Sequence, residues 1–293
     1  MLDTVEVHNG TGEGLYTAVK KLLHERRIPL SNIIGFSCDN CATMMGPKNG
    51  FQANLKKDIP SVFVLGCVCH SFALCANHAS NSLPSWLEAF LKNVGLYFAR
   101  SSKLQSDFHS IQEAIQVYEH KVLKISQTRW LSRGKVNERV LEQWEALLLF
   151  FQTESVTDKV DGAAEIYKTM TTSGTKRMLL FLNYVLKKVN IMNVELQSEY
   201  YRLHKLYPMI CGEYRNILGM FIKRDVLDRE KLSVIDPSDS KLHVALNRLN
   251  VGGRCEALLL NEPLGRNEDR FRSDCLQFLT MLCCQIHKRF PFK

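Results

Sequence analysis

The sequence predicts a protein of mixed class, α/β plus all-α, in which a small parallel or mixed sheet precedes a large helical region. Two short apolar runs bounded by turn-forming residues, 33–36 and 62–68, occur early in the chain, and such runs are typical of strands. From about Leu83 onward, apolar residues recur at helical spacing and alternation of period two is nearly absent. We therefore divide the chain into a sheet-containing region, 1–135, and a helical region, 136–293.

The first predicted element is an amphipathic helix over 11–27. The basic residues lie on other faces of it, and one face carries the apolar residues Leu15, Val19, Leu22 and Leu23. An apolar face of this kind is expected to cover one face of the sheet.

The first predicted strand is the buried apolar run 33–36, which leads into Asp39. Active-site residues of open α/β sheets lie at the carboxyl edge of the strands. Asp39 is therefore the first candidate site residue, although an Asp that follows a strand is often simply a turn-former.

A helix and a second strand follow. Residues 51–58 have helical spacing, and Pro60 stops them. The run 62–68 is rich in β-branched side chains, suits a central strand, and leads to His70 at a strand-to-helix junction. Two strands joined by one helix should be parallel, so Asp39 and His70 are expected at the same edge of the sheet.

The rest of the chain is predicted to be an array of at least five helices, within 85–101, 103–118, 138–154, 175–199 and 201–222. A turn-rich passage over 228–263 is expected to be a loop with a short helix at its centre. The last predicted helix, from about Glu268 to Lys288, has an apolar face that would stay partly uncovered if part of the parent fold were missing.

Composition narrows the class of protein. The net charge of +8 and the pI near 8.9 are compatible with nucleic acid as a partner but do not demand it. No stretch approaches the roughly 20 apolar residues that cross a bilayer, so no membrane partner is expected. The ten cysteines have no regular spacing, and several fall inside apolar runs. Buried reduced thiols explain them better than a disulfide scaffold does.

Three motifs of the chain resemble those of hAT-superfamily DNA transposases and the host proteins derived from them. Residues 39–46, DNCATMMG, resemble the family's D-G-A-x-x-M-x-G, and residues 67–70, CVCH, resemble its C-x-x-H. Residues 128–130, TRW, resemble its Arg-Trp motif. The resemblance implies a partial ribonuclease H-like core in 1–135 and the family's helical insertion in 136–293, truncated before its final catalytic Glu segment.

In such transposases two Asp and one Glu hold two divalent metals, usually Mg²⁺, which activate water for strand cleavage. Asp39 matches the second Asp, whereas the first Asp and the final Glu have no counterpart in this sequence. The resemblance therefore implies an inactive remnant and not an enzyme. No cofactor is expected, because Mg²⁺ would be bound only by an intact family member.

The resemblance also implies binding roles. Trp130 matches an aromatic residue that can stack on a displaced base, and Arg129 precedes it, so both are nucleic-acid-binding candidates. Cys67 and His70 are expected to support the motif near Asp39. The function implied is a non-catalytic module that binds DNA or a protein partner, in the nucleus or otherwise in the cytoplasm.

A second hypothesis is a structural zinc site. Cys38 and Cys41 form one C-x-x-C pair, and Cys67 and His70 form a C-x-x-H pair. Four such ligands could close a tetrahedral zinc site. Against it, a predicted helix and strand lie between the two pairs, and the transposase resemblance accounts for the second pair without zinc. Purely structural roles for His70 and Trp130 also stay open.

Overall fold

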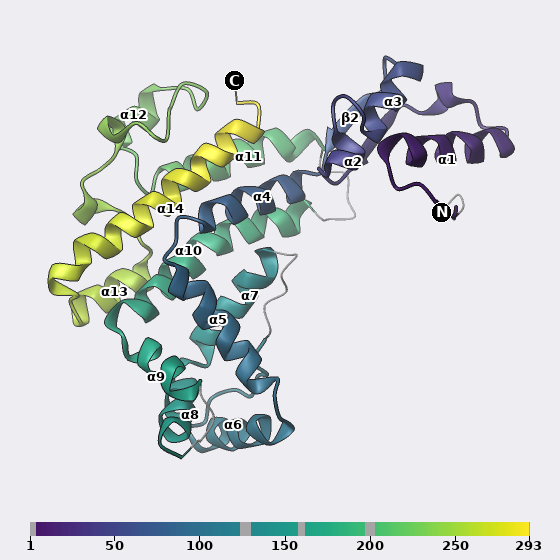
Figure 1. Ribbon diagram of the computed structural model, residues 1–293. Helices are drawn as coiled ribbons and strands as arrows, with labels where there is room; N and C mark the ends of the chain where they lie inside the picture. Colours follow the sequence, from purple (N-terminus) through teal and green to yellow (C-terminus); the bar gives the residue numbers. More distant parts are fainter. Residues whose placement is uncertain (1–3, 124–129, 158–161, 197–202, 293) are drawn as a thin grey trace. The chain divides into compact units, whose positions relative to one another are not determined.

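The computed structural model describes residues 4–123, 130–157, 162–196 and 203–292 (Figure 1). The chain forms two compact units: Met1–Ser71, called here the sheet unit, and Phe72–Lys293, called the helical unit. Each unit is considered by itself. This division falls between residues 71 and 72, whereas the motif pattern placed the domain boundary between 135 and 136.

The sheet unit contains a parallel βαβ arrangement, as predicted. Strand β1 (Gly35–Cys38) pairs in parallel with β2 (Phe63–Gly66), in the register Gly35 opposite Phe63. The remaining elements before β2 are α1 (Gly12–Glu25), the 3₁₀ turn η1 (Leu30–Asn32), the one-turn helix α2 (Ala42–Met45) and α3 (Phe51–Asp58).

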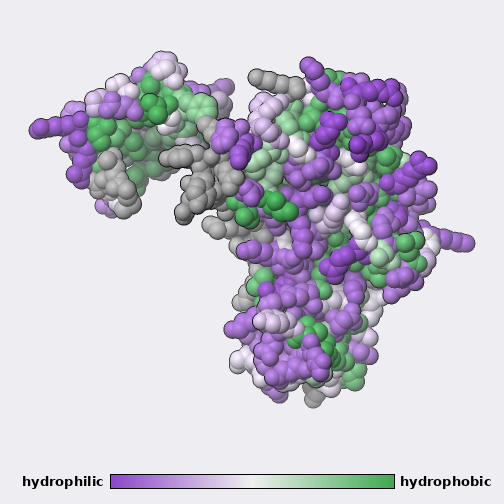
Figure 2. Space-filling model, turned by 180° about the vertical axis from the view of Figure 1, so that it is seen from behind, coloured by the Kyte–Doolittle hydropathy of each residue, from purple (hydrophilic) through white to green (hydrophobic). Residues whose placement is uncertain are grey.

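The two strands differ from the prediction in position and in burial. β1 begins two residues later than expected, because its ladder starts where Gly35 meets Phe63; Ile34, the second residue of the predicted run, is 86% exposed. Neither strand is a buried central strand, since the described sheet has only two strands and both are edges. Hydrophobic patches are accordingly visible on the surface of this unit (Figure 2).

A small core joins the helices of the sheet unit to its strands. Its buried members are Tyr16, Phe51, Leu55, Ile59 and Val62. The ring of Phe51 meets that of Tyr16 edge-on at 5.4 Å between centroids, and α1 packs against α3. The amphipathic helix expected over 11–27 is therefore present as α1, and it packs chiefly on α3.

The helical unit follows from α4 (Val68–Ser80), whose first residues belong to the sheet unit. Its longer helices are, in chain order, α5 (Ser85–Phe98), α6 (Ser102–Ala114), α7 (Trp130–Glu142), α8 (Trp144–Thr157), α9 (Ala163–Thr171), α10 (Ser173–Leu196), α11 (Leu203–Leu218), α13 (Gly253–Asn261) and α14 (Glu268–Arg289). The passage between α11 and α13 holds α12 (Arg224–Arg229), η2 (Ser240–Leu242) and η3 (Leu246–Arg248), and η4 (Gly265–Asn267) precedes α14. Most of these helices were predicted from the sequence. Helix α5 belongs to this unit because it packs on α6, α7 and α9.

One predicted helix, 138–154, is two helices in the structure. α7 ends and α8 begins on either side of Gln143, whose side chain is fully buried. Its Nε2 donates to the carbonyl of Tyr118 at 2.9 Å, and its Oε1 accepts from Gln112 at 2.7 Å. No Gly or Pro marks this point in the sequence, and the backbone of Gln143 keeps its helical bonds: its N–H donates to the carbonyl of Arg139 at 3.0 Å, and its carbonyl accepts from the N–H of Leu147 at 2.8 Å.

The core of the helical unit is extensive. Aromatic rings from α5, α6 and α8 form one cluster, whose members are Tyr97, Phe98, Phe108, Phe150 and Phe151. The apolar face of α14, expected to stay partly uncovered only if part of the parent fold were missing, is covered. Phe278, Leu279 and Leu282 are completely buried, because α14 packs on α10 and α11. Along the described part of the chain, no helix combines the length and the apolar character needed to span a membrane.

Candidate functional site

The first candidate site is the carboxyl edge of the sheet. Asp39 follows the last residue of β1 directly, and His70 lies in the first turn of α4, just after β2. Because the two strands are parallel, both residues lie at the same edge, as the sequence predicted. The two are close enough for the charge of His70 to contribute to lowering the pKa of Asp39.

The carboxylate of Asp39 is held mainly by its own turn. The Cys41 thiol donates to it and is the largest cause of its lowered pKa, followed by the backbone N–H of Cys41, which lies 3.2 Å from Oδ1. A side chain that accepts from the N–H two residues on forms an Asx-turn. Asp39 therefore has the turn-forming role considered above, and its carboxylate is nonetheless exposed to solvent.

Asn40 ties this turn to the second strand. Its Nδ2 donates to the carbonyl of Cys67 at 3.1 Å and to Ser71 Oγ at 2.8 Å, and Ser71 Oγ in turn donates to the Cys67 carbonyl. A Cβ added to Gly66 would lie 2.1 Å from Asn40 Oδ1. Only glycine leaves room for Asn40 at this point, so Gly66 and Asn40 fix the geometry of the edge together. Asn40, Ser71 and Gly66 were not among the predicted site residues, and the glycine near the end of the second apolar run was the one signal in the sequence that pointed to them.

The cysteines of the two motifs gather at the same edge. The backbone N–H of Cys67 donates to the carbonyl of Cys38 at 2.8 Å. Burial raises the pKa of the Cys38 thiol, and the neighbouring Asp39, Cys41 and Cys67 raise it further. Within the residues that the structure describes, however, no three ligand atoms of Cys38, Cys41, Cys67 and His70 lie within 4.8 Å of one another. This arrangement does not fit a closed tetrahedral zinc site.

The carboxylates needed for a metal pair are not assembled around Asp39. In the described ranges, no set of three metal-ligating side chains within 4.8 Å includes Asp39. The other Asp of this unit that the structure describes, Asp58, is engaged elsewhere: it accepts from Tyr16 at 2.7 Å and pairs with Lys20 at 2.5 Å. Two Mg²⁺ ions need several carboxylate oxygens, and these residues do not provide them.

The side chains of the predicted nucleic-acid-binding residues, Arg129 and Trp130, are not among those that the structure describes. Arg129 lies outside the described residues. Trp130 is the first residue of α7, and the structure describes its backbone but not its side chain. Their proposed role stays a prediction.

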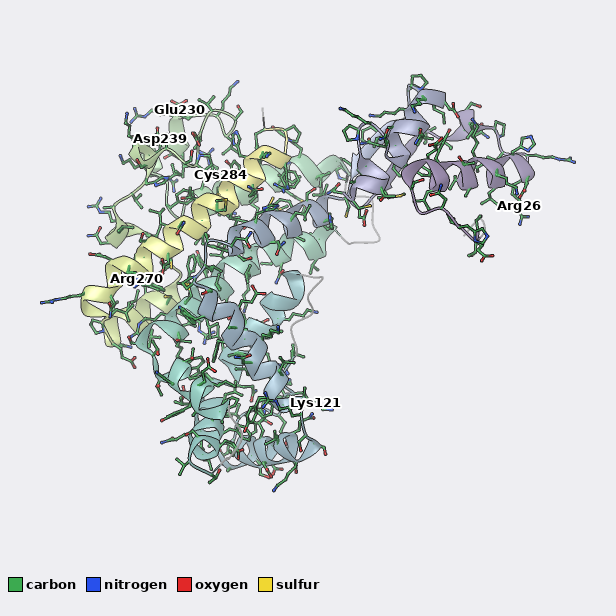
Figure 3. All side chains as sticks on the ribbon, viewed as in Figure 1. Arg26, Lys121, Glu230, Asp239, Arg270 and Cys284 are labelled. Carbon is green, nitrogen blue, oxygen red and sulfur yellow. The ribbon has the colours of Figure 1, made fainter. Side chains whose placement is uncertain are left out.

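A second candidate surface lies in the helical unit. Residues 1–71 carry seven Lys and Arg against six Asp and Glu, so nearly all the net positive charge lies in residues 72–293. Four exposed arginines at the α13 and α14 end of this unit make no ion pair with any residue that the structure describes; we call them the arginine group: Arg248, Arg254, Arg266 and Arg270. Arg270 lies near the N-terminal end of α14 (Figure 3), which packs on both η3 and η4.

Three of the nearby acids pair with buried arginines. Arg272 is 5% exposed and holds Glu256 with two parallel bonds of 3.0 Å, and it also pairs with Glu268 at 2.9 Å. Glu262 lies 3.3 Å from the buried Arg177. These pairs engage three carboxylates, of which Glu262 stays exposed. Asp269 precedes Arg270 directly, and the charge of Arg270 also acts on Asp274, one turn further along α14. Residues 248–274 carry five arginines and five acids, so this segment offers exposed guanidinium groups without a net positive charge.

No protein-family model matches this chain, and no solved structure matches it.

Proposed function

We propose that this chain is a non-catalytic module derived from a hAT-type transposase, and that it acts by binding nucleic acid in the nucleus. The observation that carries the non-catalytic half is the single carboxylate, Asp39, at the sheet edge. Its turn is braced by Cys41 and Asn40, and no second acid of the described residues completes a metal site with it. The three sequence motifs support the derivation.

A cleavage assay tests the non-catalytic half. Supercoiled plasmid incubated with the chain and Mg²⁺ or Mn²⁺ should stay intact, and Asp39→Asn should behave like the unaltered protein. Asp225→Asn, which changes an exposed acid in the helical unit, serves as the matched control. Nicking that Asp39→Asn abolishes and Asp225→Asn preserves would overturn the proposal.

The arginine group supports the binding half. Exposed arginines that make no ion pair with a described residue can contact phosphates, and each phosphate contact releases counterions. Arginine also forms two parallel bonds to a phosphate, which lysine cannot. The sheet unit has no comparable excess of charge, so we assign nucleic-acid binding to the helical unit.

Fluorescence anisotropy with a labelled DNA hairpin tests this assignment. Affinity should fall steeply between about 50 and 200 mM salt. Arg266→Ala with Arg270→Ala should weaken binding and reduce the slope of log K against log salt by about two. The control pair, Arg224→Ala with Arg229→Ala, removes the same charge from exposed arginines that are already neutralised by Asp228 and Asp225 at 3.0 and 3.2 Å. It should have little effect.

Two outcomes would reject the nucleic-acid half. One is the absence of binding at low salt, which would leave a protein partner as the target of the module. The other is an equal effect of both arginine pairs, which would reduce the binding to net charge alone. If the ring of Trp130 stacks on a base, Trp130→Ala should weaken the binding of single-stranded DNA by about 1–3 kcal/mol.

A further inference from the structure

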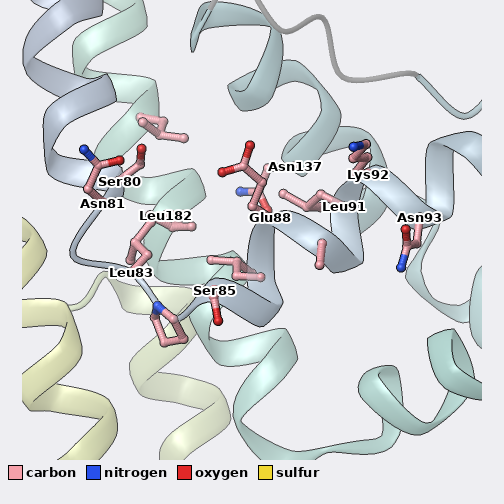
Figure 4. Close-up of a pocket in the computed structure, with 14 residues that line it drawn as sticks. Ser80, Asn81, Leu83, Ser85, Glu88, Leu91, Lys92, Asn93, Asn137 and Leu182 are labelled. Atoms are coloured by element: carbon pink, nitrogen blue, oxygen red, sulfur yellow. The ribbon is translucent and has the colours of Figure 1, made fainter.

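Two cavities of the helical unit differ in the chemistry of their walls. The larger, of about 580 Å³, lies between α5, α7 and α10 (Figure 4). Four leucines that line it are at most 6% exposed, and the side-chain oxygen of Asn137, which has no donor among the described residues, is buried out of reach of a ligand. The smaller cavity, of about 340 Å³, is lined by residues of α5, α6 and 119–122, among them His109 and Glu119. Imidazole and carboxylate groups bind metal ions, so the wall of this second cavity can contribute to a metal site.

Three metal-ligating side chains meet beside this cavity: His109 and Glu113 of α6, and Glu119. One ring nitrogen and one oxygen from each carboxylate lie within 4.8 Å of one another. Nε2 of His109 lies 2.7 Å from Oε2 of Glu119, and Nδ1 of His109 lies 3.7 Å from Oε2 of Glu113. The three side chains are between 48% and 60% exposed, so an ion from solvent can reach all of them.

The local fold brings these three residues together. Residues four apart lie on the same face of a helix, so α6 presents His109 and Glu113 to one side. The helix ends at Ala114, and Gln116 takes a left-handed backbone conformation with a φ of 56°. The chain reverses there, and the N–H of Val117 donates to the carbonyl of Gln112 at 3.0 Å. The returning segment therefore places Glu119 against α6.

Buried glutamines hold the backbone on both sides of Glu119. Gln112 is 3% exposed, and its Nε2 donates to the carbonyl of His120 at 3.0 Å. Gln143 is completely buried, and its Nε2 donates to the carbonyl of Tyr118 at 2.9 Å. The two glutamines also bond to each other at 2.7 Å. Because packed helices fix the position of Glu119 in this way, little ordering remains to be done when an ion binds.

The charges of the three ligands do not balance. Two carboxylates share one imidazole, and no lysine or arginine that the structure describes forms an ion pair with Glu113 or Glu119. The neighbouring His120 is engaged elsewhere, since its Nδ1 lies 2.6 Å from Oε1 of Glu142. The group keeps a net negative charge whether or not the imidazole is protonated. An excess of negative charge where three ligand atoms converge favours a cation.

We infer that His109, Glu113 and Glu119 form a binding site for Zn²⁺. An imidazole nitrogen suits Zn²⁺ better than the hard ions Mg²⁺ and Ca²⁺, which prefer oxygen ligands. Three protein ligands leave the fourth position of a tetrahedral zinc ion to water or another small ligand, and the cavity lies beside that position. The ion ties the end of α6 to the returning segment. This site is separate from the Asp39 edge and independent of the proposed nucleic-acid binding.

Titration with Co²⁺ tests the site. Co²⁺ occupies zinc sites, and its absorption distinguishes the ligands, because thiolates add a strong near-ultraviolet band that nitrogen and oxygen ligands lack. This distinction matters in a chain with ten free thiols. The unaltered, reduced protein should bind one Co²⁺ saturably with visible bands and without the thiolate band. Zn²⁺ should displace the Co²⁺ and abolish these bands.

Variants locate the ion. His109→Ala and Glu119→Gln each remove one ligand and should weaken Co²⁺ binding at least about tenfold. The matched controls are His78→Ala and Glu165→Gln, which change an exposed histidine and an exposed acid of other helices that belong to no three-ligand group of the described residues. They should leave the affinity unchanged. All four positions are exposed, and circular dichroism checks that each variant folds.

Hydrogen exchange gives a second readout. Zn²⁺ should slow the exchange of amides within 102–122 in the unaltered protein and should have no such effect in His109→Ala, because an ion that binds only the folded state stabilises it. Two results would overturn the inference: no saturable binding of Co²⁺ by the unaltered protein, or equal affinity in His109→Ala with a thiolate band. The first would leave His109 with ion pairs alone, and the second would assign the ion to the cysteines.

Discussion

The sheet unit and the helical unit differ in how completely they bury their apolar side chains. The sheet unit has one small core of five buried apolar side chains, and its two strands remain partly exposed. The helical unit surrounds long helices such as α10 and α14 on several sides, so that whole helix faces are buried. A two-stranded sheet gives little independent stability. Individual hydrogen bonds and close backbone contacts must therefore contribute a larger share of the stability of the sheet unit than of the helical unit.

The cysteines show the same contrast. All ten are free thiols. In the helical unit, Cys75, Cys255, Cys275 and Cys283 are buried, as expected from the composition, whereas Cys211 and Cys284 are half-buried. In the sheet unit Cys41 is exposed and Cys38, Cys67 and Cys69 are half-buried, so the expectation of buried thiols is wrong there. The loops at a sheet edge do not exclude solvent as packed helices do.

The largest expected effect tests the difference between the two cores. Phe151→Ala removes a fully buried ring from the aromatic cluster and should lower the free energy of unfolding of the helical unit by about 3–5 kcal/mol. Phe36→Ala, which removes a half-buried ring stacked on Phe51 at 4.8 Å, should cost the sheet unit only about 1–2 kcal/mol. Hydrogen exchange with mass spectrometry reads the two units separately in one chain. Equal losses would contradict the comparison.

The next effect concerns close backbone packing in the sheet unit. A Cβ added to Gly12 would lie 2.5–2.7 Å from backbone atoms of Thr43, Asn49 and Gly50, so Gly12→Ala should destabilise this unit by about 1–3 kcal/mol. Gly10→Ala is the matched control, since nothing lies within 4 Å of its added Cβ. Hydrogen exchange of the α1 amides, measured at increasing urea concentrations, gives the stability of the sheet unit in both variants. A neutral Gly12→Ala would show that α1 is not held tightly against the 43–50 segment.

A smaller effect is the dependence of the sheet unit on pH. The ammonium of Lys20 lowers the pKa of Asp58 below its ordinary value of 3.8, and the Tyr16 hydroxyl lowers it further. Because the folded pKa is depressed, the contribution of Asp58 is fully present above pH 3.8 and is lost as pH falls through the folded value. Asp58→Asn should flatten the pH dependence of unfolding below pH 4. Tyr16→Phe should flatten it less, and an unchanged profile in Asp58→Asn would contradict the assignment.

The last prediction concerns the order in which the cysteines of the two units react with a thiol reagent, and it involves no change in stability. Cys41 should react first with iodoacetamide under native conditions, because it is exposed. Burial raises the pKa of the Cys75 and Cys255 thiols to about 12, so they should react only after unfolding. Peptide mass spectrometry gives the order of labelling. Early labelling of Cys255 would mean that α13 opens readily from the helical unit.

Several elements of the sheet unit could be predicted because their signals are local. Pro60 and the spacing of 51–58 define α3, whose bounds agree with the prediction. The helix predicted between the two apolar runs makes their connection a crossover and the strands a parallel pair, which placed Asp39 and His70 at one edge. The start of β1 was shifted because apolar composition does not set a strand's register; the pairing of Gly35 with Phe63 does.

The residues of the candidate sites could be predicted only in part from local sequence signals. Asp39 and the cysteines were found from motifs, but the role of Asn40 depends on groups 27 and 31 residues away. Nothing in the sequence around Asn137 distinguishes it from a solvent-exposed helix residue. Its burial and its missing donor follow from the packing of α7 on α10.

The sequence by itself determined the mixed class, the parallel pair of strands, most of the helices and the position of Asp39 after a strand, because these depend on periodicity, turn residues and the length of connections. Only the tertiary structure decided where the chain divides into units, which thiols are buried, that the face of α14 is covered, and that the side chain of Asn137 is buried. These properties depend on contacts between residues distant in the chain, and local propensity carries no information about which faces meet.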